Sequence, residues 1–218
     1  MNTPLPSGIL TGPNLLSCID ELSVQDHDDL AHCSQIATRS ADQGKSGRFV
    51  NSTMWMDEFM TTLNFLGWSV FQDAIFTRKR FIVPSSVADF LVLRAQAMPD
   101  KRQGNAMIDT LDALKSDNSA IASMDSESLL GTSFQVIPAR YDSKGFLEIA
   151  VFNLELVAHT KRSNFLFLNW EGHAIEIIQQ GAYLKLDKNV LKSKRALIDA
   201  KRREINSTRF DLWKTRNS

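Results

Sequence analysis

The run Phe146–Val157 constrains the fold most, because it is apolar at both alternating sets of positions. Side chains along a β-strand point to opposite faces in turn, so a strand with one solvated face alternates apolar and polar residues. An apolar character at both sets predicts a central strand that is covered on both faces, or a strand that meets a partner.

Three more runs have strand character, and they lie on either side of the first along the chain: Phe134–Tyr141, Phe165–Trp170 and Ala174–Gln179. The first run itself extends as far as His159. The loops between these runs are short and polar, whereas a parallel connection needs a dozen residues or more. The second half of the chain is therefore predicted to form an antiparallel meander.

Helical periodicity dominates the middle of the chain. One helix is predicted from the cap candidates at residues 51–53 to Gly67, and a strand or hairpin follows it. A second begins at Ser86, which has capping-box spacing to Asp89, and a third spans about residues 105–115. Asp187 is predicted to cap a long basic C-terminal helix. The expected fold class is α+β, with N-terminal helices, an antiparallel β-meander and this final helix in a single domain over residues 51–218.

Residues 1–50 are rich in Ser, Gly, Asp, Gln and Pro, with only scattered aliphatic side chains. Such a segment buries too little apolar surface to offset the entropy of ordering it. We therefore expect a flexible acidic N-terminal tail, with a short helix over residues 14–22 only if that segment docks somewhere.

The net charge of zero hides a separation of charge along the chain. Residues 1–38 contain five acidic residues and no Lys or Arg, whereas residues 185–218 contain eleven basic and four acidic residues. This asymmetry favours binding of a protein or an anionic surface. The candidate binding residues are Lys188, Lys192, Lys194, Arg195, Lys201, Arg202 and Arg203. A solvated helix face has the same pattern, and we also consider an acidic tail that covers the basic helix.

Catalytic chemistry has only weak candidates: His159, Glu171 and His173. The two histidines are expected about 20 Å apart in the proposed meander, given roughly 3.3 Å per residue, so they do not share a site. Glu171 could orient its neighbour His173, but no Ser or Cys is marked by its context as a nucleophile.

Nucleotide and metal binding are not supported. Gly44-Lys45-Ser46 resembles the end of a phosphate-binding loop, but Arg39 stands where that motif needs a glycine. The tail holds Cys18, His27, His32 and Cys33, whose spacing differs from that of structural zinc sites. We therefore predict no metal and no cofactor, and the two cysteines form no disulfide framework.

Composition narrows the classes of function and partner that remain. The sequence has a pI of about 6.9 and none of the usual nucleic-acid-binding motifs, so nucleic acid is an unlikely partner. It also lacks an apolar run long enough to span a bilayer and a positively charged signal region, which favours a cytoplasmic location or export without a classical signal.

The leading hypothesis is a non-enzymatic binding protein that uses the sheet face and the basic helix, with homo-oligomerisation through an open sheet edge also expected. The alternatives are a membrane-active, toxin-like protein that associates with anionic lipid, and a hydrolase that uses a lone histidine.

Overall fold

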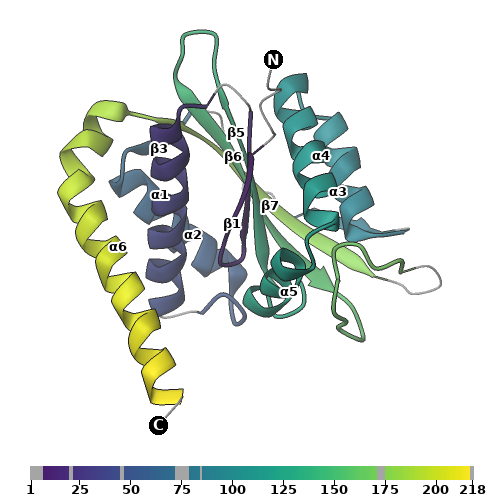
Figure 1. The fold of residues 1–218 in the computed structure, drawn as a ribbon. Helices are drawn as coiled ribbons and strands as arrows, with labels where there is room; N and C mark the ends of the chain where they lie inside the picture. The colour runs from purple at the N-terminus through teal and green to yellow at the C-terminus, as the bar shows by residue number, and fades with distance from the viewer. Residues whose placement is uncertain are drawn as a thin grey trace.

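The computed structural model describes residues 7–19, 22–44, 47–71, 79–83, 85–170 and 175–216, with only the backbone described at residue 7 and over 205–216. These residues form a mixed β-sheet between two layers of helices (Figure 1). The strands are β1 (Ser7–Thr11), β2 (Asn14–Cys18), β3 (Trp68–Val70), β4 (Lys79–Ile82), β5 (Phe134–Tyr141), β6 (Leu147–Val157) and β7 (Glu176–Leu186). The helices are α1 (Val24–Gln43), α2 (Ser52–Phe65), α3 (Val87–Gln96), α4 (Lys101–Lys115), α5 (Asn118–Glu127) and α6 (Lys188–Arg216).

The strand order is β1-β2-β5-β6-β7-β3, and β4 also pairs with β7. The pairs β5–β6 and β6–β7 are antiparallel, as predicted for the second half of the chain. β2 lies parallel to β5, in the register that sets Leu16 opposite Ile137. The sheet is thus mixed, because an N-terminal hairpin adds to the edge of strands that come much later in the sequence.

Helices α1, α2 and α6 cover one face of the sheet (Figure 1). The core on this face contains Trp55 and Phe59 of α2, Leu30 of α1, and Ile149 and Leu184 of the central strands, all at most 1% exposed. The Trp55 and Phe59 rings stack with their centroids 5.1 Å apart. The helix predicted from residues 51–53 to Gly67 therefore packs its apolar side chains onto the sheet.

Helices α3, α4 and α5 cover the opposite face (Figure 1). Their core contains Phe134 and Phe165, which meet edge to face with centroids 5.1 Å apart. Gly104 allows α4 to approach α3 closely, because a Cβ at this position would lie 2.4 Å from the carbonyl oxygen of Ala95. Both sets of β6 side chains are consequently buried, and the two-sided apolar run is a central strand.

Several predicted helix boundaries are confirmed. Ser86 and Asp89 form a reciprocal capping box at the start of α3. Asn51 caps α2, and Gly67 follows that helix at a φ of +105°, in the left-handed region that favours glycine. Local side-chain chemistry therefore determines where these helices begin and end.

The prediction of a flexible tail is wrong for the described part of residues 7–44, which forms β1, β2 and α1. The predicted helix over residues 14–22 is mostly strand β2, whose five side chains are all buried. In α1, Leu30, Cys33, Ala37 and Ala41 recur at helical spacing and are at most 1% exposed. Small side chains bury well when a helix lies close to its neighbours. Composition alone therefore underestimated the surface that this segment can bury.

The predicted meander and element order also need correction. Strands β1 and β2 precede the helices, and the segment Phe165–Trp170 forms a turn and an irregular stretch with no strand. Its side chains Phe165, Leu166 and Trp170 are buried in the core, which is why the segment looked like a strand. Of the strand or hairpin expected after Gly67, the described parts are β3 and β4, which each pair with β7, and residues 72–78 lie outside the described residues.

Candidate binding groove

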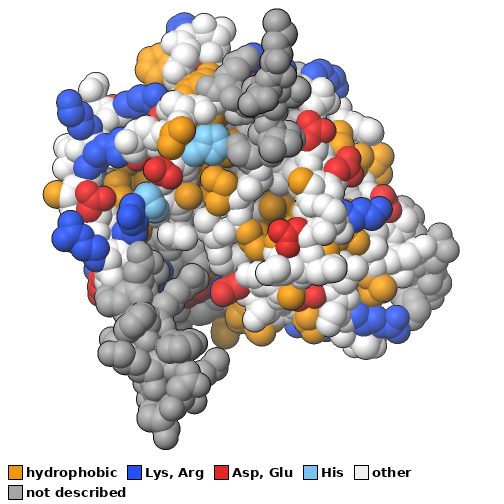
Figure 2. Space-filling model, in the orientation of Figure 1, with side chains coloured by type: hydrophobic (Ala, Val, Ile, Leu, Met, Phe, Trp, Pro, Cys, Tyr) orange, Lys and Arg blue, Asp and Glu red, His pale blue; other side chains and the backbone are white. Residues whose placement is uncertain are grey.

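The basic helix α6 packs against the domain along one narrow seam. Its first turn is capped by Asp187, whose carboxylate accepts hydrogen bonds from the backbone N–H groups of Asn189 (2.9 Å) and Val190 (3.2 Å). Leu191 and Ile198, seven residues apart, are buried in the core that α1 shares. The other side chains over residues 188–204 are exposed or half-buried. Lys and Arg side chains gather over α6 on the left of Figure 2, with acidic and histidine side chains beside them.

Asp26 of α1 accepts hydrogen bonds from three directions. Lys188 Nζ lies 3.0 Å from its Oδ2 atom, the Ser23 hydroxyl donates at 2.9 Å, and the Tyr141 hydroxyl donates to the same oxygen. Burial raises the pKa of this carboxyl, but hydrogen bonds from Tyr141, Lys188 and Ser23 outweigh it and leave the pKa below its ordinary value. Asp26 is therefore a charged tether for the start of α6.

Asp29, one turn further along α1, forms a bidentate ion pair with Arg195. Both guanidinium Nη atoms lie 2.7 Å from a carboxylate oxygen, and the Asp29 side chain is only 4% exposed. The hydrogen bonds to Asp29 raise the pKa of Arg195 above its ordinary value. Two predicted binding cations, Lys188 and Arg195, are thus already paired with acidic side chains of the protein itself.

The acidic N-terminal segment does lie against the basic helix, but as a structured helix of the domain. The cover that we considered is therefore an ion-paired contact between α1 and α6, with α1 itself buried in the core.

Two other predicted binding cations flank a hollow beside this seam. Lys194 Nζ lies 4.2 Å from the centre of the Phe65 ring, in cation–π contact. Lys201 Nζ lies 3.0 Å from Glu204 Oε2 on the exposed side of α6.

The last three predicted cations do not meet at one point. Arg202 Nη1 lies 3.4 Å from His32 Nε2. The pKa of His32 is lowered first by burial and then by the nearby Arg202 charge. Lys192 and Arg203 are exposed. The seven cations therefore spread along α6, and only part of them surrounds the hollow.

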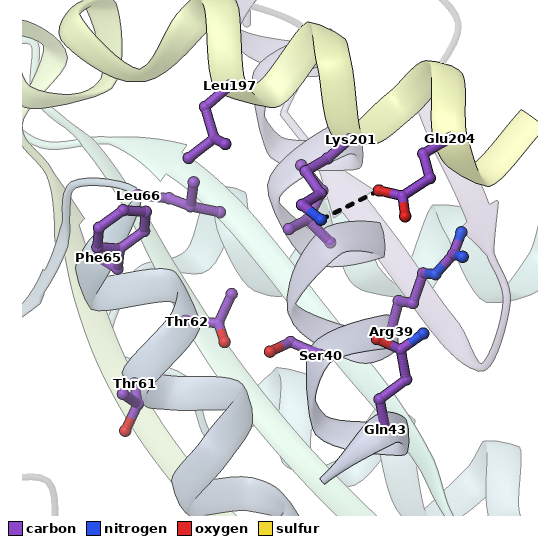
Figure 3. Close-up of a pocket in the computed structure, with 11 residues that line it drawn as sticks. Arg39, Ser40, Gln43, Thr61, Thr62, Phe65, Leu66, Leu197, Lys201 and Glu204 are labelled. Carbon is purple, nitrogen blue, oxygen red and sulfur yellow. Dashed lines mark hydrogen bonds and ion pairs between the residues drawn. The ribbon is translucent and has the colours of Figure 1, made fainter.

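The hollow is a groove of about 390 Å³ between α1, α2 and α6 (Figure 3). Its apolar walls are Ile36 from α1, Phe65 and Leu66 at the end of α2, and Leu197 from α6. Phe65 and Leu197 are 52% and 39% exposed, which is unusual for large apolar side chains that face one another. A pocket of this volume with apolar walls has the size of a small-molecule site.

Polar side chains border the groove. Ser40 of α1 and Thr62 of α2 face each other across it (Figure 3). Arg39 and Lys201 supply positive charge at the end nearer the C-terminus of α6, and Glu204 supplies one carboxylate. The groove thus combines an apolar floor with hydroxyl groups and a mainly basic border.

The weak catalytic candidates do not form a site in the described structure. His159 is exposed in the bend after β6. Glu171 and His173 lie outside the described residues, so neither their expected separation nor their pairing is tested. Among the described residues no cluster of His, Cys, Asp and Glu could hold a metal ion, and no helix is long and apolar enough to cross a membrane. Cys18 and Cys33 are free and buried, and burial raises the pKa of each thiol to about 12.

Sequence reasoning missed the α1 and α2 side of the groove. Ile36 and Arg39 lie in the segment predicted to be a flexible tail, and Phe65 lies in a predicted helix with no binding role assigned to it. A usable signal existed, because Phe65 falls off the Trp55, Phe59 and Leu63 stripe and so points away from the sheet.

No protein-family profile matches this chain, and no curated protein is similar to it in sequence. Its fold is similar to that of a solved structure described as a delta-endotoxin, with a TM-score of 0.50 and 11% sequence identity over 85% of this chain and 88% of that one. A structure described as the Evf virulence factor gives a TM-score of 0.40 and 7% identity over 90% of this chain and 83% of that one. At such identities the delta-endotoxin likeness concerns the fold alone.

Proposed function

We propose that this chain is a non-enzymatic binding protein whose ligand lies in the α1–α2–α6 groove. The observation that carries the proposal is the groove itself, with apolar walls from three helices and the cations Arg39 and Lys201 at its border. Such a surface suits an amphipathic molecule that has an apolar body and an anionic group. The sheet contributes no open binding face, since helices cover both of its sides.

The pairing of Lys188 and Arg195 with Asp26 and Asp29 sharpens the role expected of the basic helix. A cation already engaged by a buried carboxylate has less attraction left for an incoming anion than a cation at the groove border. Lys194 contacts the Phe65 ring, and Lys201 is paired with the exposed Glu204, so we assign anion recognition to these two cations. The two cations that pair with nearly buried carboxylates position α6.

The test is a fluorescence titration with the anionic, apolar dye 8-anilinonaphthalene-1-sulfonate. Leu197→Gln should weaken binding about five-fold, the equivalent of roughly 1 kcal/mol. Val190→Gln is the matched control, because Val190 is 38% exposed on the same helix, close to the 39% of Leu197, but does not line the groove. Equal effects of the two substitutions, or no saturable binding by the native protein, would contradict the proposal.

A second candidate function is that of a membrane-active, toxin-like protein that associates with anionic lipid. Its support is the fold shared with a protein described as a delta-endotoxin. The exposed Phe65 and Leu197 beside Lys194 and Lys201 add an apolar surface next to cations, which suits an anionic lipid surface.

Vesicles separate this candidate from a soluble binding protein. The full chain should co-sediment with anionic vesicles at low salt, release an enclosed dye, and lose binding as salt screens the charges. The full chain is required, because removing residues 1–50 would remove β1, β2 and α1 from the folded domain. Complete inertness towards both neutral and anionic vesicles would eliminate this candidate and leave the dye-binding test unaffected.

A further inference from the structure

A second, polar pocket lies away from the groove, where the segment after α1 meets the start of α2 and the end of β6. Its volume is about 280 Å³, and its polar lining comes from Arg48, Asn51, Ser52, Thr132 and Glu155. It has no apolar floor comparable to that of the groove, so it needs a different kind of ligand.

Arg48 is the side chain that points to a ligand. Its side chain is only 9% exposed, and its Nη2 atom pairs with Asp42 at 3.1 Å. The guanidinium carbon lies 4.9 Å from the centre of the Phe49 ring, in cation–π contact. The Nε and Nη1 atoms are buried and have no hydrogen-bond acceptor among the described residues. Buried donors without an acceptor are costly, so an oxyanion placed here would be strongly favoured.

Glu155 gives the same pocket a negative wall. Its carboxylate accepts a hydrogen bond from the Ser52 hydroxyl in the first turn of α2. An incoming anion would gain from Arg48 but would meet the charge of Glu155, whereas an incoming cation would meet the reverse. A molecule that carries both charges satisfies both walls.

We propose that this pocket binds a small zwitterion, with its oxyanion on Arg48 and its ammonium group on Glu155. The volume suits a free α-amino acid, and the hydroxyl of Thr132 and the amide of Asn51 supply further hydrogen bonds. Lys161 Nζ contacts the Thr132 hydroxyl and adds positive charge beside the pocket. This inference does not depend on the groove or on its ligand.

The experiment is isothermal titration of the native chain with each of the twenty free amino acids, and with propionate and n-propylamine as single-charge probes. At least one amino acid should bind saturably and at least ten-fold more tightly than either probe, a gap of about 1.4 kcal/mol. No saturable binding by any amino acid, or binding no tighter than that of propionate, would overturn the proposal.

Two substitutions test which side chain of the pocket binds which charged group of the amino acid. Arg48→Gln should abolish binding of the amino acid, whereas Arg94→Gln should leave it unchanged, because Arg94 also stacks on an aromatic ring (Phe81, 5.3 Å) but lies outside the pocket. Glu155→Gln should weaken binding of the amino acid and strengthen binding of propionate. An unfolded variant would lose both, so it cannot produce this opposite change. Loss of both ligands in Glu155→Gln with intact circular dichroism would contradict the assigned role of Glu155.

Discussion

The two helix layers differ in how they are held to the sheet. The α3–α4–α5 layer is joined by apolar contacts, with aromatic rings interlocked at Phe134 and Phe165 and a glycine that brings α3 and α4 together. The α1–α2–α6 layer also has a deep apolar core, but over residues 188–204 its outer helix α6 is attached by the ion pairs of Lys188 and Arg195, by the Lys194–Phe65 contact and by the buried side chains of Leu191 and Ile198.

The difference explains why the groove lies in one layer and not in the other. Apolar close packing leaves few voids, so a layer built in that way has a full interior. Long charged side chains hold α6 by their ends and leave space beside the seam, where Phe65 and Leu197 remain partly exposed. Attachment through charges thus produces both the hollow and its basic border.

The largest expected effect on stability is in the α3–α4–α5 layer, which we call the closed layer because the groove beside α6 lies in the other layer. Phe165→Ala should lower the free energy of unfolding by about 3–5 kcal/mol, because it removes a fully buried ring that packs against Phe134 and Gly131. Phe65→Ala, at a 52% exposed position of the groove, should cost less than about 1 kcal/mol. Urea denaturation measures both, and similar losses would remove the contrast between the layers.

The next effect concerns the attachment of α6. Arg195→Met should cost about 1–3 kcal/mol, since it leaves the nearly buried Asp29 carboxylate without its bidentate partner. Lys192→Met, at an exposed position of the same helix, is the control and should change stability by less than about 0.5 kcal/mol. If the two variants unfold at the same urea concentration, the ion pair does not hold the helix.

A smaller effect is expected at the start of α3. Ser86→Ala removes the side chain that accepts from the Asp89 backbone N–H at 3.0 Å and should cost about 1 kcal/mol. Because the cap is local to the closed layer, dye binding in the groove should not change. A weaker dye affinity in this variant would show that the two layers are coupled.

The smallest effect is on acid stability. The folded state holds the pKa of Asp26 below the ordinary value of 3.8, so its contribution to stability is present above that value and is lost as pH falls through the folded pKa. Urea unfolding of the native chain and of Asp26→Asn between about pH 5 and pH 2 measures it. The Asn variant should lose less stability on acidification, and parallel curves would contradict the tether at Asp26.

The sequence predicted those parts of the fold whose signals are local. The apolar periodicity of Trp55, Phe59 and Leu63, the Ser86 capping box and the two-sided run of β6 each correspond to a real element. Non-local pairing was not predictable in this way. The residues of β2 do not indicate that β5 is its partner. The short buried segment that begins at Phe165 has the composition of a strand but forms none.

The candidate sites show the same difference between features that the sequence predicts and features that depend on contacts between distant segments. The charge separation of the sequence correctly indicated that the two ends of the chain are electrostatically complementary, and Asp26 and Asp29 do meet α6. The groove and the Arg48 pocket each combine residues from segments distant in the sequence, and neither has a motif. Arg48 lies within the segment predicted to be a flexible tail, so its burial could be found only once α1 and α2 were placed.

The parallel pairing of β2 with β5 has a consequence for how the chain folds. When the chain emerges from the ribosome, the N-terminal hairpin is complete long before β5 exists, and its exposed edge has to wait while more than half of the protein is synthesised. Pairings between distant segments close slowly, because the entropy of a long loop is lost before the contact is gained. We therefore expect the hairpin to join the sheet late, and the unpaired β2 edge to be the surface through which partly made chains aggregate.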